Sequence, residues 1–223
     1  LAPSKPGSLT EVPESDYEVV VFDNRSPSLA APTSSFKAID NPDFSSPSIA
    51  SAGKCEVICF TSDYESSFKD LSHRQIRTVL EAWRDRTAEL SELSYIEYIA
   101  AFENRGEEVG VTLNHPHGQI YAYSYLPPKT QRMLDVATAH KKKSGNILLE
   151  DILARELSDK VRIVAENEEW VAYVPYASRY PFEIHLAPRR RVTDFLALDE
   201  AASDAFAPIA KEVLTRLDGV FGV

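Results

Sequence analysis

The two halves of this 223-residue sequence repeat the same order of secondary-structure patterns, and this repeat limits the possible folds more than any other feature. In the first half, apolar runs at 17–22 and 55–60 predict strands, and a long amphipathic pattern at 71–93 predicts a helix. In the second half, three strand patterns lie at 162–166, 170–174 and 182–188. A helical pattern follows at 199–217. The repeat predicts an α+β fold of duplicated units, each a mostly antiparallel sheet packed with a long helix.

The first long helix has a recognisable beginning. Ser72 is followed three residues later by Gln75, which is the spacing of a capping box. Apolar side chains, among them Ile76, Val79 and Trp83, then recur at helical spacing and predict one buried face.

The remaining elements divide the chain into two parts. Further strands are expected at 95–103, 111–113 and 119–125, and helices at 129–143 and 147–157. We therefore expect an N-terminal domain at 1–128, and a helical connection with a C-terminal domain at 129–223. The second copy of the repeat stops after its helix, so we expect this C-terminal unit to be incomplete in the sequence.

Composition excludes several classes of function. The formal charge of −10 argues against a protein that binds nucleic acid or an anionic membrane surface. No apolar run approaches the roughly 20 residues that span a bilayer, and the first residues lack the apolar core of a signal peptide. Cys55 and Cys59 stand in one strand-like run, which favours two buried free thiols. We expect a cytoplasmic protein.

Two of the five histidines, His115 and His117, flank a proline between two predicted strands. Four interpretations are possible for this pair. The histidines could be ordinary polar residues at a strand end, or ligands of a metal such as zinc. They could also perform acid–base chemistry, or one could attack phosphorus as a nucleophile.

The residues around the pair favour nucleophilic chemistry on phosphorus. Gly118 allows a ligand to approach the backbone closely, and Gln119 offers a neutral amide donor for a phosphoryl oxygen. Pro116 stiffens the pair, and Thr112 adds a hydroxyl group nearby. An imidazole is largely neutral at physiological pH, so such a nucleophile needs no strong base beside it.

These residues carry a resemblance to a known family. The segment F-E-N-R-G at 102–106, followed by G-V-T-L-N-H-P-H-G-Q-I-Y-A-Y at 110–123, closely resembles the active-site segment of galactose-1-phosphate uridylyltransferases. This family is a branch of the histidine-triad superfamily. The resemblance extends to the segments 20–28, 56–60, 174–176 and 180–183, and so covers most of the chain.

The resemblance implies a fold of duplicated histidine-triad units and a ping-pong exchange of a uridylyl group between UDP-glucose and galactose-1-phosphate. By position, His117 would be the nucleophile, His115 its neighbour, and Gln119 the donor to the transferred phosphoryl group. The implied substrate-binding residues are Phe22, Asn24, Phe102, Glu103, Asn104, Thr112 and Gly118.

The resemblance also implies metal sites, from which this sequence departs. Many relatives bind zinc through His115, another histidine and a C-x-x-C pair before the first strand, but Ala2 stands where the second cysteine would be. Some relatives bind iron through a glutamate whose place is taken here by Met133. We therefore expect no essential cofactor, with zinc at His115 as the family's alternative and no iron site.

Two further functions remain open from the sequence. One is a nucleotide phosphorylase or hydrolase of the same superfamily; the other is a protein that binds UDP-sugars without turnover. The resemblance implies a homodimer, and the other partners are the small-molecule substrates, with no nucleic acid and no membrane.

Overall fold

The computed structural model of this protein describes residues 16–33, 50–106 and 115–221. The chain divides into two compact units. Unit 1 comprises residues 1–65 and 82–127, and unit 2 comprises residues 66–81 and 128–223. In the described part of the chain, no helix has the length and apolar character needed to cross a membrane. The expected domain boundary at residue 128 concerns functional domains, which are defined differently from these compact units, and it stays a prediction.

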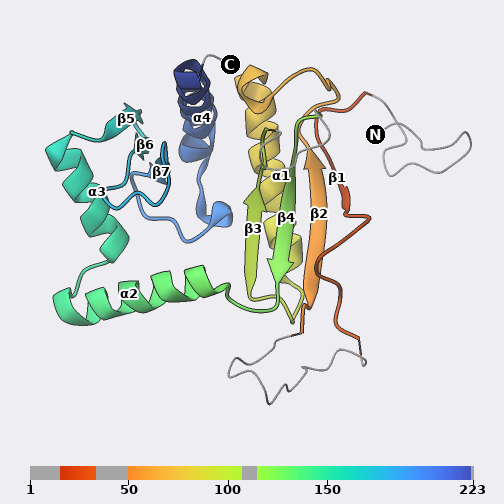
Figure 1. Ribbon diagram of the computed structural model, residues 1–223, viewed down its shortest axis with the longest axis horizontal. Coiled ribbons are helices and arrows are strands. Elements are labelled where there is room, and N and C mark those ends of the chain that lie inside the picture. Colours follow the sequence, from red (N-terminus) through yellow and green to blue (C-terminus); the bar gives the residue numbers. More distant parts are fainter. Residues whose placement is uncertain (1–15, 34–49, 107–114, 222–223) are drawn as a thin grey trace, which may run out of the picture. The chain divides into compact units, whose positions relative to one another are not determined.

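Unit 1 is built on a four-stranded antiparallel sheet. Its strands are β1 (Val20–Asp23), β2 (Gly53–Cys59), β3 (Tyr98–Phe102) and β4 (His117–Tyr123), in the spatial order β1-β2-β4-β3 (Figure 1). Side chains alternate between the two faces of a strand, and burial in β4 follows this period. Gly118, Ile120 and Ala122 are buried, whereas the residues between them are half-buried. One face of this sheet is therefore core and the other is accessible.

The helix α1 (His73–Ser91) covers the core face of this sheet with its residues from Ala82 onward. The ring of Trp83 meets the buried Phe60 edge to face, with centroids 6.3 Å apart. Glu56 of β2 points to the same face and forms an ion pair with Arg86 of α1. The helix begins with the predicted capping box, which is confirmed: Gln75 donates its backbone N–H to the Ser72 hydroxyl at 3.2 Å, and Ser72 donates its N–H to the Gln75 side chain at 2.9 Å.

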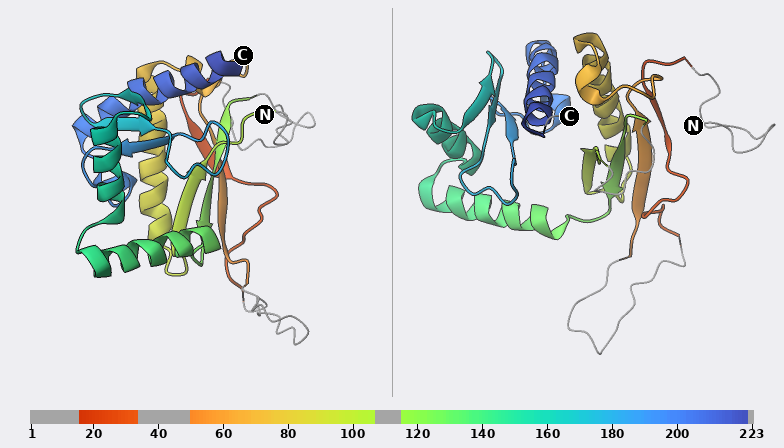
Figure 2. Two further views of the ribbon diagram at one scale, coloured as in Figure 1. Left: turned by 60° about the vertical axis from the view of Figure 1, so that its left-hand side comes forward. Right: turned by 45° about the horizontal axis from the view of Figure 1, so that its top comes forward.

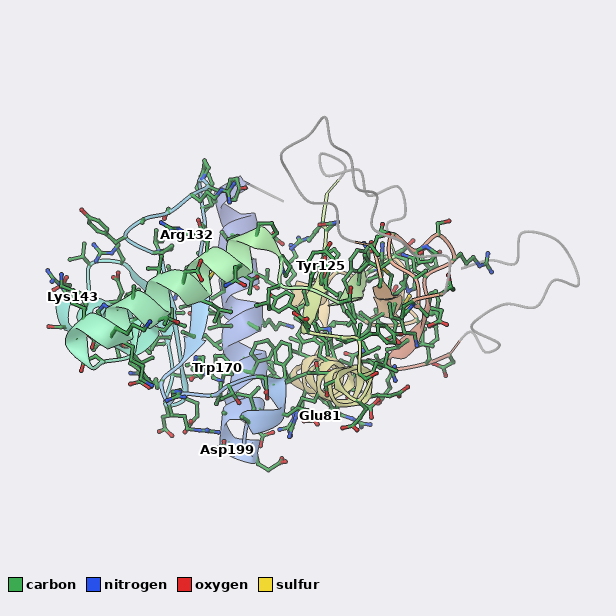
Figure 3. The ribbon with its side chains drawn as sticks, turned by 90° about the horizontal axis from the view of Figure 1, so that it is seen from below. Glu81, Tyr125, Arg132, Lys143, Trp170 and Asp199 are labelled. Atoms are coloured by element: carbon green, nitrogen blue, oxygen red, sulfur yellow. The ribbon has the colours of Figure 1, made fainter. Side chains whose placement is uncertain are left out.

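Unit 2 contains a three-stranded antiparallel sheet and its helices. After α2 (Pro128–Ser144) and α3 (Leu148–Asp159), the strands β5 (Ile163–Glu166), β6 (Trp170–Tyr173) and β7 (His185–Pro188) lie in that order, and α4 (Glu200–Phe221) follows. The three lysines at the end of α2 are exposed; Lys143 is labelled in Figure 3.

The central strand β6 is buried on both faces because a helix packs on each (Figure 2). Val171 and Tyr173 form a cluster with Leu153 of α3. On the opposite face, Trp170 donates its ring N–H to the Ala202 carbonyl of α4 at 2.7 Å and meets the ring of Phe206. Successive side chains of β6 point to opposite faces of the sheet, and so they pack alternately against α4 and α3.

The structure differs from the predicted elements mainly at their ends. The first strand begins at Val20 and not at Tyr17, and the last begins at His185 and not at Phe182. Phe182 has a φ of 60°, within a turn in which the Glu183 carboxylate accepts the backbone N–H of Arg179 at 2.6 Å. Both helices at 128–159 form as predicted. The predicted strand at 111–113 lies outside the described residues.

Candidate active site

The strand register of unit 1 brings several of the predicted site residues into one row. Phe22 of β1 pairs with Val57 of β2, Val57 pairs with Gln119 of β4, and Gln119 pairs with Phe102 of β3. Directly paired residues of an antiparallel sheet project their side chains to the same face. His117 stands two residues before Gln119 and so lies on this face too. The row is half-buried and lies on the face opposite α1.

One hydrogen bond orients the ring of His117. Its Nδ1 lies 2.7 Å from the backbone carbonyl oxygen of His115. A carbonyl only accepts, so Nδ1 carries the proton and donates it. In a neutral imidazole the other nitrogen, Nε2, then holds a free lone pair. The ring is therefore prepared to act as a nucleophile through Nε2.

The ring of His115 has a different environment. Its Nε2 lies 3.0 Å from the hydroxyl oxygen of Tyr17, and burial lowers the pKa of His115 below its ordinary value. Burial, followed by the neighbouring Cys59, raises the pKa of Tyr17. His115 is thus a neutral, partly buried ring, while His117 stands at the first position of β4.

The other predicted site residues follow the ends of the strands. Asn24 comes just after β1, where its backbone N–H donates to the Cys55 carbonyl at 3.0 Å and its side-chain oxygen accepts the N–H of Ser26 at 2.9 Å. Glu103 and the exposed Asn104 follow β3, at the end of the sheet where β4 begins. Thr112 lies outside the described residues. A substrate role for each of these residues stays a prediction.

Gly118 has a packing reason to be glycine, beside the role in ligand approach that was predicted for it. A Cβ atom at this position would lie 2.8 Å from the Phe102 carbonyl oxygen and 2.8 Å from Cζ of Phe60. Phe60 is fully buried and cannot turn away. The glycine therefore lets β4 lie close to β3 and to the core, between His117 and Gln119.

We expect Gly118→Ala to lower the free energy of unfolding by about 1–3 kcal/mol, because the added methyl group overpacks the core. Urea unfolding followed by circular dichroism measures the change. Gly219→Ala is the matched control: a Cβ at this helical position meets nothing within 4 Å, so stability should be unchanged or rise by up to about 1 kcal/mol. Equal unfolding midpoints for wild type and Gly118→Ala would contradict the packing argument.

The described residues do not fit the zinc site that the resemblance implies. Within 16–33, 50–106 and 115–221, no group of three or more His, Cys, Asp or Glu side chains is placed to hold a metal ion. Nε2 of His115, one of the two ring nitrogens that could bind a metal, is hydrogen-bonded to the Tyr17 hydroxyl group. Cys55 and Cys59 are free and buried, as predicted.

The sequence patterns did not single out Tyr17, which was expected only as the first residue of a strand. It stands 98 residues from His115, and no local spacing links the two. Its hydroxyl group contacts the histidine pair only because β1, β2 and β4 are neighbours in the sheet.

Comparisons with known proteins identify the family of the chain. Residues 1–127 match the family described as galactose-1-phosphate uridyl transferase, N-terminal domain, and residues 133–223 match its C-terminal domain. The chain is 47% identical to the galactose-1-phosphate uridylyltransferase of Streptomyces lividans over 100% of its own length and 57% of that protein. It is 35% identical to the enzyme of the same name from Thermotoga maritima, over 95% of the chain and 65% of that protein.

A solved structure of a uridylyltransferase has the same fold, with a TM-score of 0.81 and 26% identity, over 93% of this chain and 65% of that one. The chain thus spans somewhat less than two thirds of the length of these relatives. The matches of both family domains, together with the H-P-H-G-Q segment on β4, show that the chain belongs to the galactose-1-phosphate uridyl transferase family.

Proposed function

We propose that the full-length protein exchanges a uridylyl group between UDP-glucose and galactose-1-phosphate through a covalent uridylyl-His117 intermediate. The observation that carries this proposal is the hydrogen bond from Nδ1 of His117 to the His115 carbonyl, which leaves the Nε2 lone pair free. Membership of the family supports the substrates, and the position of His117 on an accessible sheet face supports its role as nucleophile.

The reaction consists of two matched steps at the same phosphorus atom. In the first step, Nε2 of His117 attacks the α-phosphorus of UDP-glucose; an N–P bond forms, and the P–O bond to the β-phosphate breaks. Glucose-1-phosphate leaves with the electron pair of that bond. In the second step, a phosphate oxygen of galactose-1-phosphate attacks the same phosphorus, and the electron pair of the N–P bond returns to Nε2. A covalent intermediate thus divides one difficult transfer into two similar steps.

The row beside His117 supports this chemistry. Gln119 lies two residues from the nucleophile on the same face, where its amide can donate to a non-bridging oxygen of the transferred phosphoryl group. Phe22 and Phe102 stand on either side of Gln119 along the row and provide flat apolar surfaces for the uridine group. Basic residues are needed to neutralise the charge of the phosphates. Arg25, which follows the β1 strand of Phe22, and Arg105, which follows the β3 strand of Phe102, are the candidates.

Isotope exchange tests this function directly. With UDP-glucose and labelled glucose-1-phosphate, but without galactose-1-phosphate, the full-length protein should transfer label into UDP-glucose, because the first step is reversible. Release of UMP to water, or of UDP when phosphate is added, with no exchange, would show a hydrolase or phosphorylase instead. Binding of UDP-glucose without exchange or release would show a binding protein.

We also propose three broader properties. The two units are duplicated histidine-triad units, which agrees with an antiparallel sheet and a long helix in each. The protein acts in the cytoplasm, which agrees with two free buried thiols. It acts as a homodimer, because the family resemblance implies substrate contacts that are supplied across a dimer interface.

A further inference from the structure

The ring of His115 is held by a tyrosine in a place where the family resemblance implies a metal ion. The Tyr17 hydroxyl oxygen lies 3.0 Å from Nε2 of His115, and the two ring centroids are 6.4 Å apart with planes tilted by 44°. The distance is that of a hydrogen bond, and the tilt keeps the hydroxyl group near the edge of the imidazole, where the nitrogen lone pair lies.

The hydroxyl group of Tyr17 retains its proton, because burial and the neighbouring Cys59 raise the pKa of Tyr17. A protonated hydroxyl group is both a hydrogen-bond donor and an acceptor. It therefore holds Nε2 of His115 by a hydrogen bond whichever nitrogen of the ring carries the proton.

The same ring is linked to the nucleophile through a short, stiff piece of backbone. The carbonyl of His115 accepts Nδ1–H of His117 at 2.7 Å, and the carbonyl of the next residue, Pro116, accepts the N–H of Phe60 at 3.1 Å. Pro116 has a fixed φ angle. The His115 carbonyl therefore lies between two anchors: Tyr17 holds the ring on one side, and Phe60 holds the following peptide on the other.

We propose that Tyr17 is a positioning residue for His117, whose hydroxyl group holds the His115 ring in the place of a zinc ion. By holding that ring, it directs the His115 carbonyl at Nδ1 of His117 and keeps Nε2 as the free nitrogen. The inference rests on the proposed role of His117 as nucleophile. Tyr17 itself touches no reacting atom.

Tyr17→Phe removes only the hydroxyl group and tests the proposal in the full-length protein. The rate of uridylyl transfer in a single turnover should fall by about 10–100-fold, because a slightly misplaced nucleophile loses reactivity. Binding of UDP-glucose should stay unchanged. Tyr64→Phe is the matched control, since Tyr64 belongs to the same unit and is 64% exposed; it should retain the wild-type rate.

A second readout needs no turnover. In ¹⁵N NMR of the imidazole groups without substrate, wild-type protein should show His117 protonated at Nδ1 alone. Tyr17→Phe should show a mixture of the two tautomers at His117. An Nε2–H signal for His117 in the wild-type protein would overturn the proposal even if the variant did not fold.

Three other results decide the matter. An unchanged transfer rate and an unchanged His117 tautomer in Tyr17→Phe would overturn the proposal. One zinc ion per chain by elemental analysis, lost in His115→Asn, would show that a metal holds the ring instead. If wild-type protein shows no uridylyl transfer, the proposed function fails, whereas the tautomer measurement still decides whether Tyr17 positions the histidine pair.

Discussion

Replacing His117 with alanine is expected to lower the exchange between UDP-glucose and glucose-1-phosphate by at least about four orders of magnitude. Without Nε2 no N–P bond can form, and loss of a covalent nucleophile commonly costs 10⁴–10⁶ in rate. The stoichiometric burst of glucose-1-phosphate should disappear as well. Rapid-quench measurement of this burst, with label in the uridylyl group, shows whether any covalent intermediate remains on the protein.

The fall in rate caused by His117→Ala should come from the lost chemical step and not from a loss of folding stability. His117 is half-buried at the beginning of β4, and its truncation removes no core side chain. The unfolding midpoint should therefore remain within about 1 kcal/mol of wild type. His185→Ala is the matched control, because His185 is exposed in the other unit, where its ring lies 3.0 Å from the carboxylate of the neighbouring Glu183; its exchange rate should be unchanged. Retention of exchange by His117→Ala would remove His117 from the role of nucleophile.

Glu56→Ala is expected to destabilise unit 1 by about 3 kcal/mol, because the substitution removes the buried carboxylate and leaves the charged Arg86 beside the exposed carboxylates of Glu89 and Asp85. Glu56 is 2% exposed, and its carboxylate accepts two hydrogen bonds from Arg86, at 2.9 Å from Nε and 2.8 Å from Nη2. This bonding raises the pKa of Arg86, so the guanidinium stays charged at any pH at which the protein is folded. Urea unfolding of unit 1, followed by the fluorescence of Trp83, measures the loss.

Two further variants distinguish the effect of losing the Glu56–Arg86 ion pair from the effect of losing side-chain volume. Asp85→Ala removes an exposed carboxylate 3.9 Å from the same arginine and should cost less than about 1 kcal/mol. The double variant Glu56→Leu, Arg86→Met replaces both charges by apolar groups of similar volume and should recover most of the stability that Glu56→Ala loses. If the double variant is less stable than Glu56→Ala, the lost stability comes from packing and not from an unpaired charge.

The local features of the fold could be predicted from the sequence because they depend on neighbouring residues. The capping box at Ser72 involves residues three apart, and the helical spacing of Ile76, Val79 and Trp83 follows from 3.6 residues per turn. Strand ends were less predictable. Tyr17 has the side chain of a strand residue, but the ladder between β1 and β2 begins at Val20, opposite Cys59.

The candidate site was predictable as a set of residues, and not as an arrangement. The H-P-H-G-Q segment pointed to His117 and Gln119 because the proposed nucleophile and the proposed donor are two residues apart on one strand. That Phe22 and Phe102 join them in one row depends on strand register. A slip of one residue would send their side chains to the opposite face, and strand patterns of this length do not specify such a register by themselves.

The sequence by itself indicated the helices, most of the strands, the proposed nucleophile and the family, because each of these depends on residues that lie close together along the chain. Only the tertiary structure decided what surrounds the histidine pair. Tyr17 reaches His115 across 98 residues, and Gly118 is glycine because Phe60 and the Phe102 carbonyl occupy the space beside it. The physical reason is the same in both cases: such contacts arise from the packing of strands that are distant in sequence, and no local pattern records which distant side chain will fill a given space.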